Sequence, residues 1–370
     1  NGSENLAKGK RYGLFPSGAN GWIVSEEAFM QPLRKVISKL KLRASYGQVG
    51  NANLGGRRFA YLSTITDDYE TLNMYKWGLD SSYGLTGMAE GEFAVQDLTW
   101  EIVNKMNLGV ELGFLNGMID LQLDYFDERR KDIFMPRESV PMTAGFMKQP
   151  WKNFGKVTNQ GVEVSLNVNK QFGKDLFVSL MGTFTYAHNE ITEKDEPSAV
   201  VGTNRAETGH PVGQLTGYIA EGLFTADDFE DVSTGKLKEG IPTQSFVGKL
   251  RPGDIRYRDV NGDGKVDVFD KSPIGGTKDP EIVYGFGLNM KYKNLDFGAL
   301  FQGIGRSWNI LGSSIIPGAN RGVTGNMFTN ANDRWTVDNP SQNVFYPRLD
   351  DGINSNNNQS STWWLRNMSF

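Results

Sequence analysis

The 370-residue chain contains no cysteine and only two histidines, His188 and His210. It therefore offers no disulfide framework, no thiolate ligand for a metal and no cysteine nucleophile. Two histidines far apart in the sequence are too few for a histidine-based metal centre or a Ser-His-Asp triad. No Walker loop, Gly-x-Ser-x-Gly elbow or His-Glu-x-x-His sequence is present. We therefore predict that the chain is not an enzyme and that it carries no catalytic residue.

Two further features are missing, an excess of positive charge and a long apolar run. Lys and Arg number 39 against 43 Asp and Glu, a net charge of −4. Phosphate binding leaves a basic footprint, so we expect no nucleic acid partner. No segment reaches the roughly 18 apolar residues of a membrane helix. The strands of a membrane barrel bury only alternate residues in lipid, so low hydropathy does not argue against a barrel.

Regular alternation of apolar and polar residues is what the sequence does have, together with 44 glycines and 12% aromatic residues. In the segment 102–114 the even positions are apolar except for Asn104, while the odd ones include Lys105, Asn107 and Glu111. A period of two indicates a β-strand with one apolar face. The pattern recurs at 40–46, 119–125, 162–168, 176–186, 282–292 and 295–301, more weakly at 11–24, and in an interrupted form at 364–370.

The connections between these segments alternate between short and long. The short turns lie near 115–117, 171–175 and 293–294, and a linker at 25–38 with one helical turn capped by Ser25 takes another short position. The long connections cover 50–98, 131–159, 188–280 and 305–361, the last with a polar run at 354–361 that we expect to be a flexible tip. All short turns would lie at one end of the strands, which is typical of outer-membrane barrels.

The two faces of the predicted strands differ in a way that suits a barrel. Aromatic residues fall near both strand ends, as at membrane interfaces; they are Tyr46, Trp100, Tyr125, Phe184, Tyr186, Tyr284, Phe301, Trp363 and Trp364 at one end and Phe114, Phe172, Tyr292 and Phe297 at the other. The opposite face is mixed in charge, as in a wet lumen; it includes Lys41, Arg43, Lys105, Glu111, Asp120, Asp124, Glu163, Asn167 and Asn289. A soluble β-sandwich also alternates, but with shorter strands and no such asymmetry of loops.

The number of strands points to a larger assembly. We count about nine, whereas single-chain bacterial barrels have an even number. An open sheet edge in lipid would leave backbone groups without hydrogen bonds. We therefore interpret the sequence as a contiguous piece of a larger transmembrane antiparallel β-barrel, with both termini cut.

The segment 259–270 matches a calcium-binding loop. Asp259, Asn261, Asp263, Asp267 and Asp270 supply oxygens at loop positions one, three, five, nine and twelve, the Lys265 carbonyl would supply position seven, and Gly264 stands at the sharp sixth position. Position twelve is Asp rather than Glu, and no flanking helices are evident, so the loop is dockerin-like rather than an EF-hand pair. We predict a structural calcium here. The alternative is a solvated turn held by Asx hydrogen bonds.

Several stretches resemble the SusC/RagA family of TonB-dependent outer-membrane transporters from the Bacteroidetes lineage. They are RYGLFPS at 11–17, GW at 21–22 with SEE at 25–27, LKLRASYGQVGN at 40–51, GHPVG at 209–213 with GY at 217–218, EGLF at 221–224, PGDI at 252–255 leading into 259–270, NDRW at 332–335 and YPRL at 346–349. Each is weak alone. Together they are specific, and they cover nearly the whole chain in the family's order.

The resemblance implies a 22-stranded barrel in the bacterial outer membrane, of which residues 1–370 would form part of one domain and 188–280 a long external loop containing 259–270. It also implies a SusD-like surface lipoprotein as partner, contact with outer-membrane lipid, energy supplied through TonB by way of an absent plug region, and glycan or peptide as cargo. We expect the calcium loop to stiffen the surface on which the lipoprotein docks. Two other functions stay open: another TonB-dependent receptor, such as a siderophore importer, or a soluble secreted β protein with a dockerin-like binding module.

Overall fold

The computed structural model describes the chain except for residues 67–74, 80–82, 86–87, 147, 313–327 and 351–353. It divides into two compact units. The first comprises 1–201, 207–210 and 283–302, and the second comprises 202–206, 211–282 and 303–370. Within the described parts, no helix is long and apolar enough to cross a membrane.

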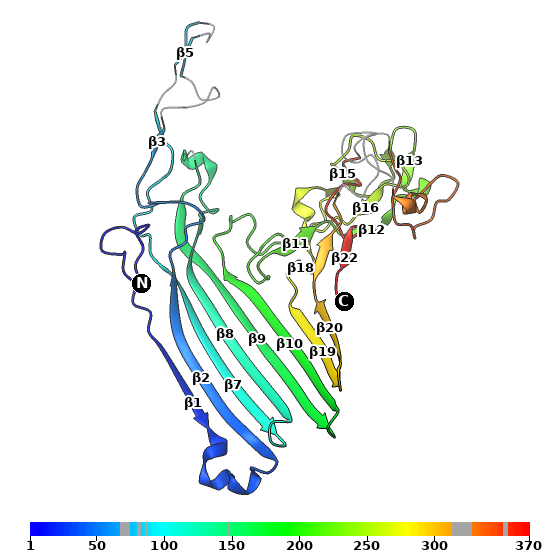
Figure 1. The fold of residues 1–370 in the computed structure, drawn as a ribbon. Helices are drawn as coiled ribbons and strands as arrows, with labels where there is room; N and C mark the ends of the chain where they lie inside the picture. The colour runs from blue at the N-terminus through cyan, green and yellow to red at the C-terminus, as the bar shows by residue number, and fades with distance from the viewer. Residues whose placement is uncertain (67–74, 80–82, 86–87, 147, 313–327, 351–353) are drawn as a thin grey trace. The chain divides into compact units, whose positions relative to one another are not determined.

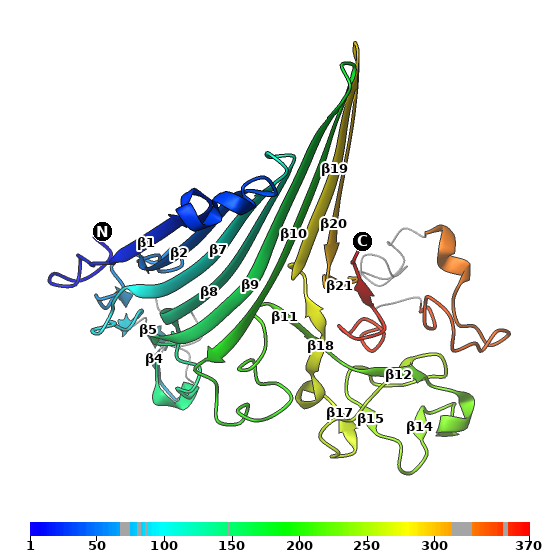
Figure 2. The same cartoon turned by 90° about the horizontal axis from the view of Figure 1, so that it is seen from below.

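The first unit is built on an eight-stranded sheet whose long strands lie side by side (Figures 1 and 2). Their order is β1 (Ser17–Ile23), β2 (Ile37–Asn51), β7 (Glu101–Phe114), β8 (Ile119–Pro136), β9 (Trp151–Phe172), β10 (Leu176–Glu193), β19 (Ile282–Tyr292) and β20 (Leu295–Gly305). The pairings from β1 to β10 are antiparallel. This confirms the all-β antiparallel class predicted from alternation. β1 begins only after Pro16, which cannot donate to a ladder.

The short connections gather at one end of this sheet (Figure 1). Between β7 and β8, Leu115, Asn116 and Gly117 all have positive φ angles, of 51°, 59° and 80°. Asn and Gly tolerate this region best, which is why the pair marks a hairpin. The linker after β1 holds two 3-10 helices, η1 (Val24–Glu26) and η2 (Ala28–Leu33), so Ser25 lies inside a helical turn instead of capping one. The predicted separation of short and long connections is thus confirmed.

The long connections of the first unit hold only short elements. These are β3 (Ile65–Thr66), β4 (Tyr75–Trp77), β5 (Tyr83–Leu85), β6 (Ala89–Glu90) and η3 (Met142–Ala144). A small core beside them contains Leu6, Leu54, Leu98 and Trp100. Trp100 is therefore buried, and the expectation that it belongs to an interfacial ring of aromatics is wrong.

The second unit consists of short strands and loops around its own core. The elements are β11 (Gln214–Gly217), β12 (Ala220–Leu223), η4 (Ala226–Asp228), β13 (Phe229–Asp231), β14 (Lys236–Leu237), β15 (Thr243–Gln244), β16 (Ile255–Tyr257), β17 (Lys265–Val266), η5 (Val268–Asp270), β18 (Ser272–Thr277), β21 (Trp308–Ile310), η7 (Thr329–Asn332) and β22 (Leu365–Asn367). The strand expected at the C-terminus appears as β22, which pairs with β21 instead of joining the large sheet. Trp364 beside it is fully buried in the core, so it too does not belong to an aromatic ring.

Candidate functional site

The large sheet presents two chemically different faces. One row of cross-strand neighbours runs Lys41, Glu111, Gln122, Ser165 and Thr183 from β2 to β10. The next row runs Leu42, Val110, Leu123, Val164 and Phe184. We call the first the polar face and the second the apolar face. Side chains alternate along each strand, so one fixed register keeps the two sets apart over all five strands.

The polar face carries a connected set of ion pairs centred on Glu111 of β7. Its carboxylate lies 2.7 Å from Lys39, 3.4 Å from Lys41 and 2.9 Å from Arg43, all on β2. Nearer the other end of the strands, Lys105 pairs with Glu128 at 2.7 Å. Most of the predicted lumen residues are thus brought together in pairs of opposite charge, which keeps the wall hydrophilic without a large net charge.

A glycine makes room for the longest-reaching of these pairs. Arg43 of β2 lies 2.9 Å from Asp124 of β8, although β7 runs between the two strands. Gly109 stands opposite both residues in the register. A Cβ at Gly109 would come within 2.6 Å of the Asp124 Oδ1 atom and 2.9 Å of the Arg43 guanidinium. The ion pair therefore requires glycine at this position.

The polar face also contains a shallow hollow of about 250 Å³. Its lining includes Lys39, Asp120, Gln122, Ser165 and Asn167. These side chains offer ammonium, carboxylate, amide and hydroxyl groups, which can donate and accept hydrogen bonds but hold no nucleophile with an adjacent base. Such a wall can contact a polar solute or a polar protein segment and leave it chemically unchanged.

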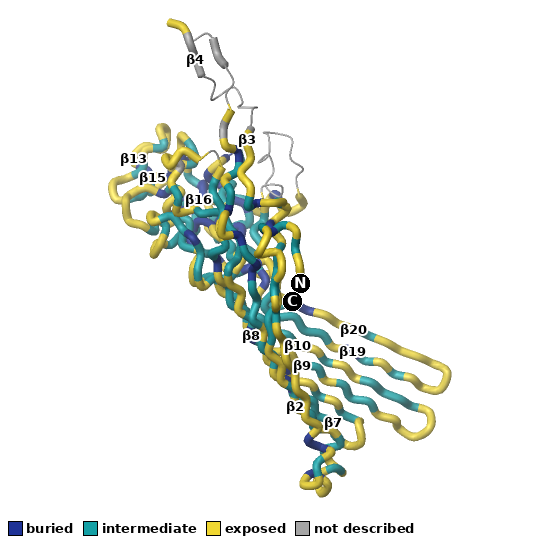
Figure 3. Tube along the Cα trace, turned by 90° about the vertical axis from the view of Figure 1, so that its left-hand side faces the viewer, coloured by how far each residue is buried: buried dark blue, intermediate teal, exposed yellow. Residues whose placement is uncertain are grey.

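The apolar face is open in this structure. Leu42, Leu108, Leu123, Leu166 and Phe184 are each between 38% and 47% exposed, and few positions on the strands are buried (Figure 3). Soluble monomers rarely expose contiguous apolar patches of this extent. Large side chains facing outward on successive strands suit contact with lipid, as in transmembrane barrels.

In the second unit, side chains of the predicted calcium loop 259–270 accept hydrogen bonds from backbone N–H groups of the same loop. The Asp259 carboxylate accepts hydrogen bonds from the N–H groups of Gly262 (2.6 Å) and Gly264 (2.7 Å). Asn261 accepts one from Asp263, and Asp263 accepts one from Lys265, both at 2.9 Å. Gly262 and Gly264 have positive φ angles of 76° and 83°, which give the sharp turn that the sequence predicted.

Asp270, the last residue of the loop, is hydrogen-bonded to the backbone of the loop. It is fully buried, and its two oxygens accept hydrogen bonds from the N–H groups of Val260 (2.8 Å), Asn261 (3.3 Å) and Asp267 (2.8 Å). Asp267 in turn accepts from the Phe269 N–H, and this bond together with Lys265 lowers the pKa of its carboxyl. Asp270 therefore joins the beginning of the loop to its end.

The oxygen atoms of this loop are of the kind that a hard cation binds, although in this structure they accept hydrogen bonds. No three carboxylate or histidine side chains among the described residues converge in the manner of a ready-made metal site. Each carboxylate has about four lone-pair positions, so an oxygen that accepts one N–H can still face a cation. The groups that would hold calcium are the Lys265 carbonyl and the side chains of Asp259, Asn261, Asp263, Asp267 and Asp270.

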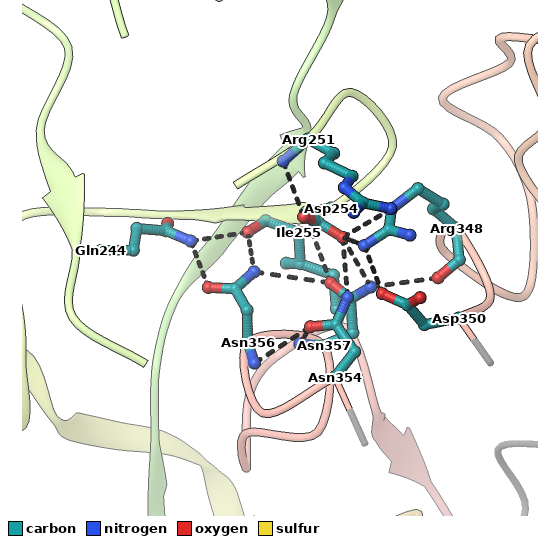
Figure 4. A network of polar contacts seen from close by, with 9 residues as sticks. All are labelled: Gln244, Arg251, Asp254, Ile255, Arg348, Asp350, Asn354, Asn356 and Asn357. Carbon is teal, nitrogen blue, oxygen red and sulfur yellow. Dashed lines mark hydrogen bonds and ion pairs between the residues drawn. The ribbon is translucent and has the colours of Figure 1, made fainter. Parts of the chain in front are cut away.

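A buried polar network that the sequence did not reveal lies elsewhere in the second unit (Figure 4). At its centre, Asp254 is fully buried, and its Oδ1 atom accepts hydrogen bonds from Arg348 Nε (3.1 Å), Asn354 Nδ2 (2.9 Å) and Asn357 Nδ2 (3.1 Å). Burial raises the pKa of this carboxyl, while Arg348 and the amide donors oppose the rise. Buried charges are tolerated when paired and hydrogen-bonded in this way.

The run 354–361 belongs to this network and is not the flexible tip that its composition predicted. Asn356 and Ser361 are fully buried. Asn356 Nδ2 donates to the Ile255 carbonyl (2.8 Å), and the Ile255 N–H donates to Asn357 Oδ1 (2.9 Å). The asparagine side chains therefore make the hydrogen bonds to the backbone of β16 that a neighbouring strand would otherwise make. Composition alone gives no signal for this, because the partners lie about 100 residues earlier.

Three of the motif stretches noted in the sequence meet around one glycine. Gly253 has a φ angle of +88°, and a Cβ there would lie 2.3 Å from the Trp335 ring. Its carbonyl accepts a hydrogen bond from the Arg348 N–H at 2.8 Å. The stretches 252–255, 332–335 and 346–349 are thus parts of one packed structure.

The chain matches the family model described as "TonB dependent receptor-like, beta-barrel" over residues 6–299. The chain belongs to this family. Among curated relatives, this TonB-dependent receptor chain is 31% identical over 80% of its length to the TonB-dependent receptor SusC of Bacteroides thetaiotaomicron, covering 28% of that protein. It is 29% identical over 93% of its length to the TonB-dependent receptor P26 of Formosa agariphila, covering 33% of it.

A solved structure described as the RagAB peptide transporter matches the fold of this TonB-dependent receptor chain with a TM-score of 0.69. The match covers all of the chain and 37% of the solved one, at 22% identity. The chain thus spans about a third of the length of the proteins it matches. The family assignment confirms the resemblance and the barrel fold, and the family consists of receptors and transporters rather than enzymes.

Proposed function

We propose that this chain forms part of an outer-membrane importer of the SusC/RagA kind, which takes up glycan or peptide with energy supplied through TonB. The observation that carries the proposal is the register of the large sheet, which keeps an open apolar face and an ion-paired polar face apart over five strands. A lipid-facing surface and a wet lumen need this division. Two similar proteins support this kind of importer. One curated relative is the TonB-dependent receptor SusC, and the solved structure with a matching fold is described as a peptide transporter.

The proposal includes a SusD-like lipoprotein partner and an extracellular position for the long connections. Co-purification tests both the partner and the competing assignment. An affinity tag on the protein in its native cells should recover a surface lipoprotein in near-equal amount, and deletion of the gene should abolish growth on one glycan or peptide. Recovery without a lipoprotein, together with a defect only under iron limitation, would instead assign a siderophore importer.

We further propose that the loop 259–270 binds a structural calcium ion through Asp259, Asn261, Asp263, the Lys265 carbonyl, Asp267 and Asp270. The spacing of the oxygens and the two glycines with positive φ support it. The ion would stiffen the surface on which the lipoprotein docks. Removal of calcium with a chelator should therefore reduce the amount of lipoprotein that co-purifies. If the metal-free protein recovered the same amount of lipoprotein, the calcium ion would have no role in docking.

A further inference from the structure

At the end of the sheet that carries the short turns, the apolar face ends in a band of large side chains, each between 48% and 73% exposed. They are Phe172 of β9, Tyr292 of β19, and Leu295 and Phe297 of β20. A Cβ at Gly285 would lie 3.1 Å from Thr183 Oγ1, so the odd positions of β19 continue the polar face and the even ones the apolar face. Phe286 and Phe301 stack at 4.7 Å, which puts the odd positions of β20 on that same apolar face. Aromatic rings at strand ends mark the boundary between hydrocarbon and headgroups on a membrane protein.

One lysine interrupts this apolar band. Lys170 of β9 stands opposite Val178 of β10, one row inside the pair formed by Phe172 and Leu176. Side chains alternate along a strand, so Lys170 shares the apolar face with Val164. It is exposed and makes no ion pair with any described residue. A lysine can lay its stem along apolar surface and hold its ammonium group in the headgroup layer.

The two neighbouring turns bring further positive charge to the same place. The turns 173–175 and 293–294 lie side by side (Figure 2), and the Lys293 N–H donates to the Asp175 carbonyl at 2.8 Å. The Lys293 Nζ atom lies 5.4 Å from the centroid of the Tyr292 ring, which belongs to the apolar band. With Lys174 in the first turn, three lysines stand against the single carboxylate of Asp175.

The positive charge at this end is in excess only on the apolar side. On the polar face of the same hairpin, Lys291 and Asp296 lie 3.8 Å apart and balance each other. Lys170 and Lys293 belong to β9 and to the end of β19, with β10 between them. Two strand spacings are about 10 Å. The long side chains of two lysines can therefore approach one group that lies over the end of β10.

We propose that this end of the apolar face binds an anionic phospholipid. Lys170 and Lys293 donate to its phosphate, Lys174 adds to the attraction, and the acyl chains lie on the apolar face of β10. Charge-assisted hydrogen bonds to phosphate are strong ones. The inference rests on the proposed function, which puts the short turns in the leaflet of the outer membrane that faces the periplasm and consists of phospholipid.

The test measures which phospholipid the intact protein retains. Protein purified in detergent is delipidated and mixed with equal amounts of phosphatidylglycerol and phosphatidylethanolamine that have identical acyl chains, and native mass spectrometry counts the bound lipid. Phosphatidylglycerol has a net negative charge, whereas the ammonium group of phosphatidylethanolamine is repelled by lysines. We expect phosphatidylglycerol to be preferred by about 20-fold, since each of two lysines beside an anionic headgroup contributes roughly fivefold. Equal retention of the two lipids would overturn the inference.

Substitutions then test the two lysines. Lys170→Gln and Lys293→Gln should each lower the preference about fivefold, and the double variant should remove it. Lys291→Gln is the matched control, because Lys291 lies at the same end of β19 but on the polar face, and it should keep the wild-type preference. Heat-modifiable migration shows that each variant is folded. Wild-type preference in both test variants, or an equal loss in Lys291→Gln, would refute the assignment.

Measurement of nutrient uptake separates this inference from the proposed function. A protein that imports its cargo but retains the two lipids equally would contradict the lipid site alone. A protein that prefers phosphatidylglycerol but imports nothing would contradict the proposed function alone.

Discussion

Arg43 of β2 and Asp124 of β8 form an ion pair at 2.9 Å across the intervening strand β7, directly over Gly109. Gly109→Ala should break this pair, because the added Cβ would lie 2.6 Å from the Asp124 Oδ1 atom. We expect a loss of about 1–3 kcal/mol in the free energy of unfolding, typical of overpacking. Heat- or urea-induced unfolding in detergent measures it. Gly182→Ala on β10 is the control, since its nearest neighbour would be 4.0 Å away; equal effects would contradict the steric argument.

The two faces of β8 predict opposite responses to a new charge. Leu121→Arg puts a guanidinium on the apolar face, where a charge that faces lipid costs up to about 2–4 kcal/mol. Gln122→Arg puts the same group on the polar face and should be nearly neutral. The measurement is the fraction of heat-modifiable, folded protein recovered from the membrane and its midpoint of unfolding by urea. Equal damage from both substitutions would argue against lipid contact on the apolar face.

Calcium binding can be measured directly on protein treated with a chelator. We expect calcium at 100 times its dissociation constant to raise the free energy of unfolding of the second unit by about 2.7 kcal/mol. Asp263→Asn should abolish most of that increase. Asp231→Asn is the matched control, because Asp231 also caps a turn, through Ser233 and Thr234, but lies outside the loop. If addition of calcium to the wild type produced neither a heat of binding nor an increase in stability, the loop would be a solvated turn held by Asx hydrogen bonds.

Asp254 should give the second unit a particular dependence on pH. Burial raises the pKa of its carboxyl, so the folded chain takes up a proton at a pH where the unfolded chain is ionised. This group therefore adds stability as the pH falls through the folded pKa toward the unfolded value of about 3.9. Asp254→Asn should remove that part of the dependence. Hydrogen exchange of residues 354–364 in the intact protein, compared at several pH values, measures the effect, and an unchanged profile would contradict it.

The strands could be predicted from the sequence because their information is local. Alternation in 102–114 and the Asn116-Gly117 turn specify β7 and its hairpin without reference to the rest of the chain. The burial of Trp100, Trp364 and Asn356 could not be predicted, because each depends on partners distant in sequence. The calcium loop shows both cases: its turns follow from Gly262 and Gly264, whereas the burial of Asp270 depends on the packing of the second unit.

The hydrogen bonds of Asp254 also constrain when the second unit can fold. Asn354, Asn357 and Arg348 lie 94 to 103 residues after the carboxylate that they contact. A core built on such distant contacts must close a long loop before the contacts form, which slows folding. Before residues 348–357 are in place, Asp254 has only its local hydrogen bond from the Arg251 N–H, and Ile255 of β16 lacks its asparagine partners. The segment 211–282 therefore cannot complete this core by itself, and the second unit folds only once its two distant segments have met.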